Sequence, residues 1–259
     1  MLTYPQIDPV LLDLGLVKIH WYGLMYLCAF GSAWWLGVRK TQQAWSPYDA
    51  QQISDLVFYA AIGAVLGGRL GYVLFYNLPV YLASPLEILK VWQGGMSFHG
   101  GLLGVLIAMY FYGRQQGRSF FQTTDFIAPL VPPGLLFGRL GNFINGELWG
   151  APTSLPWGMV FPHVDALPRH PTQLYEAALE GAVLFGLLWL FAAKPRPIMA
   201  VSGLFLLGYG CFRFLIEFMR LPDAHLGYLA FDWLTMGHVL TFPMLLAGAV
   251  LLGLAYRRA

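Results

Sequence analysis

Three arginines lie inside apolar stretches of the sequence: Arg69, Arg139 and Arg213. A charged side chain in an apolar environment costs several kcal/mol, so each arginine is a candidate functional residue. A guanidinium presents a planar fork of donors that matches the oxygens of a phosphate. Two or three guanidiniums that converge would bind a phosphate and stabilise negative charge on it. The alternative is that each arginine extends to a membrane surface or pairs with a helix dipole.

Other polar residues accompany these arginines. Asn142 and Glu147 follow Arg139 within the stretch G-R-L-G-N-F-I-N-G-E-L-W-G, residues 138–150. The spacing of Tyr209, Arg213 and Glu217, four residues each, predicts one helical face. Glu147 and Glu217 are therefore candidates for holding the arginines in place, although the pair Arg213–Glu217 could be purely structural.

A histidine with glycines on both sides is the candidate base. His99 lies in G-G-M-S-F-H-G-G, residues 94–101, where the glycines leave room for a bulky partner. A single histidine is often structural, and Glu147 is an alternative proton acceptor. We find no aspartate cluster that would hold magnesium and predict no metal site. Chemistry here would depend on arginine electrostatics and on a histidine or glutamate base.

The composition indicates where this chemistry takes place. Of 259 residues, 58% are hydrophobic and only 11% are charged, whereas soluble domains carry about 25% charged residues. We therefore predict a polytopic membrane protein. The net charge of +2 gives no sign of a nucleic-acid partner. Cys28 and Cys211 lie in apolar stretches and are expected to be buried small residues.

The apolar runs predict an all-α fold with seven transmembrane helices in a single integral-membrane domain, residues 1–259. Several runs approach the roughly 20 residues that span a bilayer. The predicted spans are 17–38, 53–76, 97–113, 122–143, 174–193, 200–219 and 236–256. An even number of spans is the alternative, and it would break the alternation of basic loops described next.

Basic residues in short loops predict the orientation, because they favour the cytoplasmic side. They follow the odd-numbered spans, as Arg39, Lys40, Arg114, Arg118, Lys194, Arg196, Arg257 and Arg258. The N-terminus is therefore expected outside and the C-terminus inside. The proline-rich stretch of about 148–173 is expected to form a small extracytoplasmic cap. The stretch 77–96 is expected to form a second outer segment. The polar stretch of about 40–52 predicts an arm at the cytoplasmic interface.

The three arginines are expected at one depth. Each lies in a span that runs outward, roughly 20–25 Å from the inner face at 1.5 Å per residue. Pro129, Pro132 and Pro133 are expected to interrupt the fourth span, and interrupted backbone is tolerated only inside protein or beside a wet cavity. We therefore predict a polar pocket beside residues 138–150, open to the outer leaflet.

Six stretches together resemble the prolipoprotein diacylglyceryl transferase family. They are G-R-L-G-N-F-I-N-G-E-L-W-G at 138–150, H-W-Y-G-L-M-Y at 20–26, G-G-R-L-G-Y-V-L-F-Y-N at 67–77, G-G-M-S-F-H-G-G at 94–101, R-H-P-T-Q-L-Y-E at 169–176 and G-Y-G-C-F-R-F-L-I-E-F-M-R at 208–220. The resemblance covers nearly the whole chain.

This resemblance implies an activity. An enzyme of this family, in the bacterial plasma (inner) membrane, would move the diacylglyceryl group of phosphatidylglycerol onto the lipobox cysteine of a prolipoprotein signal peptide. The products would be a thioether and glycerol 1-phosphate. The resemblance also implies no cofactor, seven spans, and an active site that faces the outer leaflet. A monomer would suffice.

The resemblance implies roles for individual residues. The catalytic candidates are His99, Arg139, Glu147 and Arg213, with the arginines on the departing phosphate. Asn142 would orient the headgroup, and Tyr22 would lie near the glyceryl unit. The further substrate-binding candidates are Arg69, Gly100, Gly150, Tyr209, Glu217 and Arg220.

Two other classes of function fit the same residues. A lipid-headgroup transporter would use the arginine pocket without forming a covalent product. A structural membrane subunit would tolerate loss of Arg139 and His99. The sequence favours the enzyme, because its polar groups gather at one depth and do not continue toward the inner face.

Overall fold

A computed structural model describes residues 2–15, 18–222 and 226–257 of the chain. These residues form two compact units: unit 1 comprises Met1–Ala33 and Ile127–Ala259, and unit 2 comprises Trp34–Phe126. Helix α1 (Trp21–Lys40) begins in unit 1 and ends in unit 2. The predicted first residue of span one, residue 17, and Arg258 lie outside the described residues.

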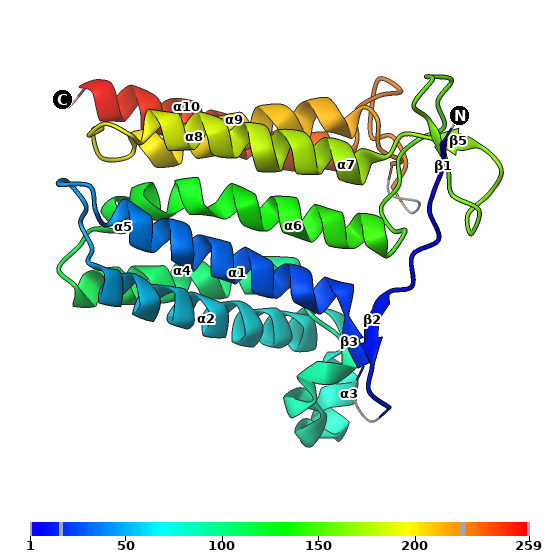
Figure 1. Ribbon diagram of the computed structural model, residues 1–259, viewed down its shortest axis with the longest axis horizontal. Coiled ribbons are helices and arrows are strands. Elements are labelled where there is room, and N and C mark those ends of the chain that lie inside the picture. The colour runs from blue at the N-terminus through cyan, green and yellow to red at the C-terminus, as the bar shows by residue number, and fades with distance from the viewer. Residues whose placement is uncertain (1, 16–17, 223–225, 258–259) are drawn as a thin grey trace. The chain divides into compact units, whose positions relative to one another are not determined.

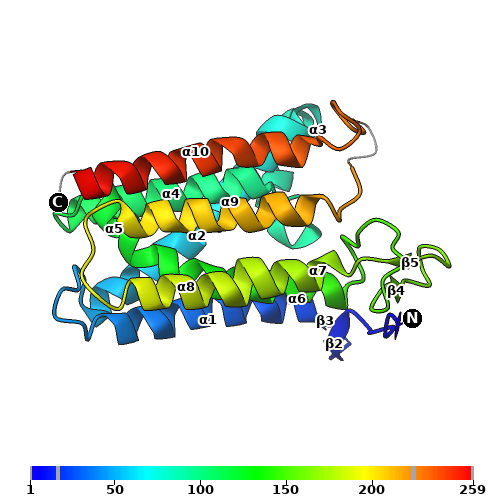
Figure 2. The same cartoon turned by 90° about the horizontal axis from the view of Figure 1, so that it is seen from above.

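Unit 1 is built on helical runs that alternate in direction (Figures 1 and 2). Helix α6 (Val131–Ile144) runs toward the cap, and α7 (Thr172–Glu176) returns through the π-helix η4 (Ala177–Val183) into α8 (Leu184–Phe191). Helix α9 (Ala200–Glu217) and helix α10 (Met236–Arg257) form the second such pair. The ends of α6 and α9 and the start of α7 therefore lie together at the cap end of unit 1.

The prolines of the fourth predicted span do not interrupt it. The helix passes from α5 (Phe120–Ile127) through the 3₁₀ turn η3 (Ala128–Leu130) into α6. Pro129 and Pro132 occupy first-turn positions, where a helix needs no backbone donor. Both prolines are buried in protein. The prolines thus change the helix type over one turn without ending the helical run, which corrects the predicted interruption.

The cap is a small sheet, which corrects the all-α prediction to a mostly helical fold. Strand β1 (Leu2–Thr3) pairs in parallel with β4 (Met159–Val160), and β4 pairs antiparallel with β5 (Pro168–Arg169). Its core is formed by Tyr4, Met159 and Phe161. The Tyr4 hydroxyl donates to the carbonyl of Ile144 at 2.6 Å and so fastens the cap to the end of α6. A second pair of strands, β2 (Val10–Asp13) and β3 (Lys18–His20), precedes α1.

Unit 2 is organised by two helices that pack closely through glycine. Helix α2 (Ala50–Tyr76) begins at an Asp49 capping box, and α4 (Phe98–Gln115) lies beside it. The connection between them contains α3 (Leu78–Ala83), η1 (Pro85–Leu89) and η2 (Val91–Gln93). Because α2 starts at Ala50, the predicted arm of 40–52 is shortened to residues 41–49. The facing glycines are Gly63, Gly67 and Gly71 on α2 and Gly100 and Gly104 on α4.

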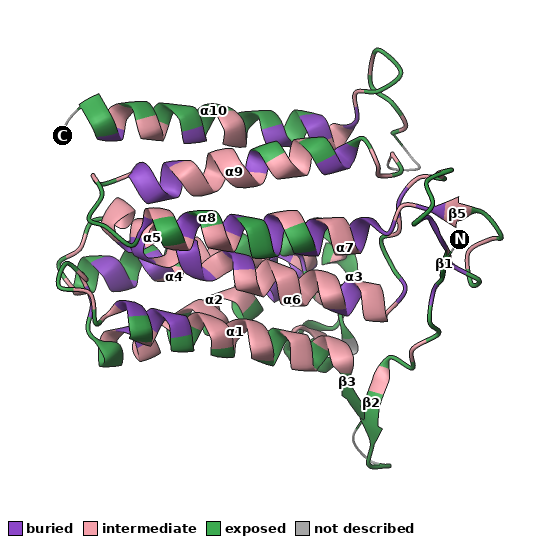
Figure 3. Cartoon of the chain, turned by 45° about the horizontal axis from the view of Figure 1, so that its top comes forward, coloured by how far each residue is buried: buried purple, intermediate pink, exposed green. Residues whose placement is uncertain are grey.

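Long apolar helices identify an integral membrane protein. Within the described residues, five helical runs are long and apolar enough to cross a membrane: Ala50–Tyr76, Phe120–Ile144, Thr172–Phe191, Ala200–Glu217 and Met236–Arg257. Helices α1 and α4 lie at the other two predicted spans but are not among the five, so the number seven stays a prediction. Many apolar side chains are exposed on these helices, and much of α10 is exposed in Figure 3, as lipid-facing surfaces are.

The cysteines differ from expectation. Both are free thiols, but Cys211 is exposed on α9 and Cys28 is only partly buried. Exposure of Cys211 follows from the lipid-facing surface of the helix that carries it, where an apolar environment does not require burial in protein.

The facing glycines of α2 and α4, called here the glycine seam, give the first prediction. A Cβ at position 104 would overlap the carbonyl oxygen of Gly63, so Gly104→Ala should destabilise the protein by about 1–3 kcal/mol through overpacking. Gly31→Ala on α1 is the control, because a Cβ there meets nothing within 4 Å. Thermal unfolding in detergent should show a lower midpoint for Gly104→Ala only. Equal midpoints for the two variants would contradict this account of the seam.

Candidate functional site

A buried glutamate draws three arginines together at the cap end of unit 1. Glu176, at the end of α7, is fully buried. Its carboxylate lies 3.0 Å from Arg139 Nε, 2.7 Å from Arg213 Nη1 and 2.8 Å from Arg220 Nη1. Arg139 comes from α6, Arg213 from α9 and Arg220 from the segment after α9. The structure thus brings Arg139 and Arg213 to one place.

Glu217 binds two of the same arginines from the other side. Its Oε2 lies 2.7 Å from Arg213 Nη2 and 3.3 Å from Arg220 Nε. Arg213 therefore bridges two carboxylates, one on each terminal nitrogen. The pairing of Arg213 with Glu217 agrees with the four-residue helical spacing in the sequence.

Glu180 is the third carboxylate of the cluster and differs from the other two. It lies one helical turn beyond Glu176, within the π-helix, and is also fully buried. Its Oε2 lies 4.0 Å from Arg139 Nη2. Among the described residues, neither oxygen of Glu180 accepts a hydrogen bond. Glu180 thus forms one longer ion pair, whereas Glu176 and Glu217 form shorter ion pairs with three and two guanidiniums.

The arginines keep part of their surface free while the glutamates do not. The side chains of Arg139, Arg213 and Arg220 are 22%, 18% and 21% exposed, against 0% for Glu176. The three arginine side chains thus stay partly accessible, although the carboxylate that pairs with them is buried. Such an arrangement can bind an anion with planar oxygen geometry, such as a phosphate.

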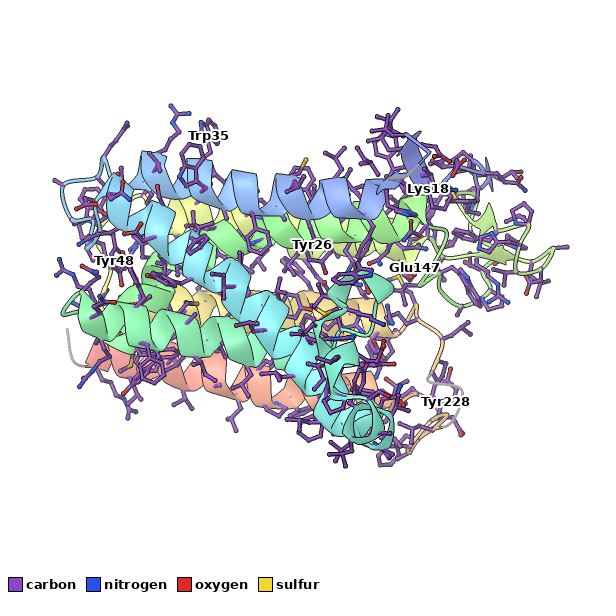
Figure 4. The ribbon with its side chains drawn as sticks, turned by 90° about the horizontal axis from the view of Figure 1, so that it is seen from below. Lys18, Tyr26, Trp35, Tyr48, Glu147 and Tyr228 are labelled. Atoms are coloured by element: carbon purple, nitrogen blue, oxygen red, sulfur yellow. The ribbon has the colours of Figure 1, made fainter. Side chains whose placement is uncertain are left out.

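Asn142 connects Arg139 to Glu147. Arg139 Nη1 donates to Asn142 Oδ1 at 3.4 Å, and Asn142 Nδ2 donates to Glu147 Oε1 at 2.8 Å. Asn145 Nδ2 also donates to this oxygen, at 3.3 Å. Glu147 forms no ion pair with Arg139 or Arg213 in the described structure, so the expectation that it holds them directly is corrected. Glu147 as a residue is exposed, and Figure 4 labels it.

A pocket connects Glu147 to the arginine cluster. Its volume is about 690 Å³, and it is lined by Asn145–Trp149, His163, Val164, Arg220 and Leu221. The loop that forms it is fixed by backbone contacts: Gln173 Nε2 donates to the carbonyl of Glu147 at 2.5 Å, and Thr172 Oγ1 to that of Leu148 at 2.8 Å. A pocket is therefore present at the end of the stretch 138–150, with Glu147 and Arg220 in a lining that is mostly apolar, whereas the sequence predicted a polar one.

The cap is attached to this loop by Arg169. The Arg169 guanidinium donates to both carboxylate oxygens of Asp165 and to the carbonyl of Gly150, and lies 4.5 Å from the ring centroid of Trp149. Its hydrogen bonds hold the pKa of Asp165 below the usual value of a carboxyl group. Partial burial lowers the pKa of His170, which favours a neutral imidazole.

Tyr22, Gly150 and Tyr209 also lie in unit 1. The Tyr22 ring occupies the space beside Gly141, where an added Cβ would come within 3.0 Å of it. Tyr209 packs against the apolar core that contains Leu184. A Cβ at Gly150 would overlap the carbonyl of Met219, so Gly150 is needed for packing of the loop, whereas the sequence predicted contact with substrate.

The remaining predicted residues belong to unit 2, and Arg69 differs most from expectation. All five of its N–H groups have backbone acceptors: the carbonyls of Glu87, Ile88, Lys90, Gly94 and Gly95, at 2.6–3.3 Å. No donor is left for a phosphate, so Arg69 fixes the segment between α3 and α4. Gly100 packs against Gly67 and Gly71.

His99 lies in the first turn of α4 and is exposed. Its ring makes an edge contact with Phe98, with centroids 5.6 Å apart. It forms no ion pair or hydrogen bond within the described part of the chain. This leaves both ring nitrogens accessible, and its role as a base stays a prediction.

The sequence reasoning missed Glu176 and Glu180. Both are carboxylates inside the apolar run Thr172–Phe191, and ionisable residues within such a run are functional candidates by default. The same argument that made the three arginines candidates therefore holds for Glu176 and Glu180. No cluster of potential metal ligands occurs in the described residues.

The long apolar helices and the arginine–glutamate cluster define an integral membrane protein with a candidate anion-binding site at the cap end of its unit 1 helices. Residues 9–254 match the family model of prolipoprotein diacylglyceryl transferase. The chain belongs to this family, whose members transfer a diacylglyceryl group to prolipoproteins, and it is accordingly a transferase.

Curated relatives match over the entire chain. Proteins from Pseudomonas paraeruginosa, Methylococcus capsulatus and Azotobacter vinelandii are 62%, 61% and 60% identical to it, and the matches cover 97%, 99% and 98% of those proteins. Each is named phosphatidylglycerol–prolipoprotein diacylglyceryl transferase.

The unequal contacts of the buried glutamates give the second prediction. Glu176→Gln should destabilise the protein by about 3–5 kcal/mol, because three guanidiniums lose a charged partner. Glu180→Gln should change stability by less than about 1 kcal/mol, because no hydrogen bond is lost. Unfolding midpoints in detergent would compare the two. Equal losses of stability in the two variants would contradict the view that Glu176 stabilises the protein through its direct ion pairs.

Proposed function

We propose that this chain transfers the diacylglyceryl group of phosphatidylglycerol to the lipobox cysteine of prolipoproteins and releases glycerol 1-phosphate. Family membership supports the reaction, and the names of the curated relatives support both substrates. The observation that carries the proposal is the convergence of Arg139, Arg213 and Arg220, whose side chains stay partly exposed, at the cap end of unit 1. A phosphodiester headgroup is the ligand that this cluster fits.

The reaction has one substitution at carbon. The sulfur of the cysteine attacks the glyceryl carbon bonded to the phosphate ester oxygen, so a C–S bond forms as the C–O bond breaks. The electron pair of the C–O bond passes to the departing phosphate, where negative charge grows. Arg139, Arg213 and Arg220 stabilise this charge, and losing one such donor typically costs about 3–4 kcal/mol in the transition state.

A base must accept the thiol proton, because a free thiol has a pKa of about 8.5. His99 is the base we propose, and its accessible ring nitrogens suit this role. Glu147 is the alternative, supported by its exposed carboxylate in the wall of the pocket. In the proposal Asn142 orients the headgroup, and Tyr22 and Tyr209 border the substrate.

The proposal includes a topology. We propose one integral-membrane domain with seven spans, the N-terminus outside and the C-terminus inside the bacterial inner membrane. The cap and the arginine cluster then face the outer leaflet, and residues 41–49 the cytoplasmic interface. The basic residues that follow the odd-numbered helices support this orientation. A monomer contains every residue the proposal requires.

Reconstitution tests this function. Purified protein in phosphatidylglycerol vesicles should lipidate a lipobox peptide without added metal or nucleotide, detected by the mass of the peptide. Arg213→Ala should lower the rate about 10²–10³-fold. Arg196→Ala is the control, because Arg196 is exposed, and its described contacts are with the carbonyl and the ring of Phe191, away from the arginine cluster. Movement of lipid across the vesicle without a lipidated peptide would instead favour a transporter.

A further inference from the structure

The first turn of α10 contacts the arginine cluster through a threonine. Thr235 precedes α10 and caps it: the N–H of His238 points to Thr235 Oγ1 at 3.4 Å, and the N–H of Thr235 donates to His238 Nδ1 at 3.2 Å. This reciprocal pattern is a capping box with histidine in the position that glutamate or glutamine usually occupies. Because Nδ1 accepts this backbone hydrogen, the threonine hydroxyl can give its own hydrogen to another acceptor.

That acceptor is the carboxylate of Glu217. Thr235 Oγ1 donates to Glu217 Oε1 at 2.8 Å, while Glu217 Oε2 faces Arg213 and Arg220. The two oxygens of Glu217 thus have different partners. A hydrogen bond to one oxygen fixes the direction in which the other points.

The surroundings make this arrangement rigid. Thr235 and His238 are buried, at 3% and 0% exposed. The imidazole ring is enclosed by Phe214, Phe218 and Trp233, with centroids 4.7, 4.6 and 5.4 Å away. Because the imidazole of His238 is closely packed among these three side chains, it cannot move, and Thr235, which is hydrogen-bonded to His238, is kept in one position.

A glycine completes the contact. A Cβ at Gly237 would overlap the carboxylate of Glu217, so this position must lack a side chain for Glu217 to lie against α10. The carboxylate is then beside the N-terminal turn of α10, where the helix dipole favours negative charge.

We propose that Thr235 is a positioning residue of the transferase. It directs Glu217 so that Glu217 in turn holds Arg213 and Arg220 in the orientation that stabilises the departing phosphate. The inference rests on the proposed function, because it assigns to Thr235 a part in that reaction.

The inference predicts which kinetic constant changes. Without the hydroxyl, Glu217 still carries its charge and the arginines still attract a phosphodiester, so lipid binding persists. Stabilisation of the transition state depends on donors that are already oriented. Without the hydroxyl the orientation of the arginines is lost, and the stabilisation falls with it. At metal sites, mutating a residue that orients a ligand side chain typically lowers metal affinity or activity 10–100-fold. The effect should therefore fall on kcat and leave KM for phosphatidylglycerol nearly unchanged.

The test compares three threonine variants in the reconstituted protein. Thr235→Val should lower kcat about tenfold, equal to 1.4 kcal/mol, with KM changed less than about twofold. Thr235→Ser retains the hydroxyl and should restore kcat. Thr241→Val is the matched control: Thr241 is a buried threonine on the same helix whose hydroxyl donates only to the carbonyls of Gly237 and His238. It should keep the wild-type kcat.

Other outcomes overturn the inference. A wild-type kcat for folded Thr235→Val, an equal loss in Thr241→Val, or a rise in KM alone would each do so. If Thr235→Val does not fold, Gly237→Ala decides, because it displaces Glu217 while the threonine hydroxyl remains; a wild-type kcat then overturns the inference. Absence of transfer by the wild-type protein is a different result, which contradicts the proposed function itself.

Discussion

The buried carboxylate of Glu176 is the constraint on which the cap end of unit 1 depends. An ionised side chain without water must be paired, and Glu176 is paired with guanidiniums from three segments. Helix α6, the end of α7 and the end of α9 are thereby held at one point. The same charges that fix the helices relative to one another also form the proposed anion-binding surface, so structure and chemistry would share one set of contacts.

The layering of charge explains how such a cluster can remain available to a ligand. Glu176 and Glu217 are buried, whereas the arginine side chains that they pair with are partly exposed. The chain Arg139–Asn142–Glu147 then extends the polar network from the cluster to the wall of the pocket.

The sequence predicted the helices better than it predicted the contacts between them. Hydropathy located all seven helical runs within a few residues, and the spacing of Arg213 and Glu217 predicted their pairing. Glu176 was missed because its partners lie 37 and 44 residues away, and no local pattern shows which helices are neighbours. The strands of the cap have two residues each, too few to show an alternating pattern. Arg69 was assigned to a phosphate because backbone carbonyls leave no mark in a sequence.

The carbonyl partners of Arg69 have an evolutionary consequence. Every amino acid supplies a backbone carbonyl, so Arg69 recognises the path of residues 87–95 and is indifferent to most of their side chains. Substitutions at Glu87, Ile88 or Lys90 leave that recognition intact. Gly94 and Gly95 are the exception, because their φ angles of 85° and 74° disfavour other residues. Homologues can thus diverge freely in much of this segment while its course through space is inherited unchanged.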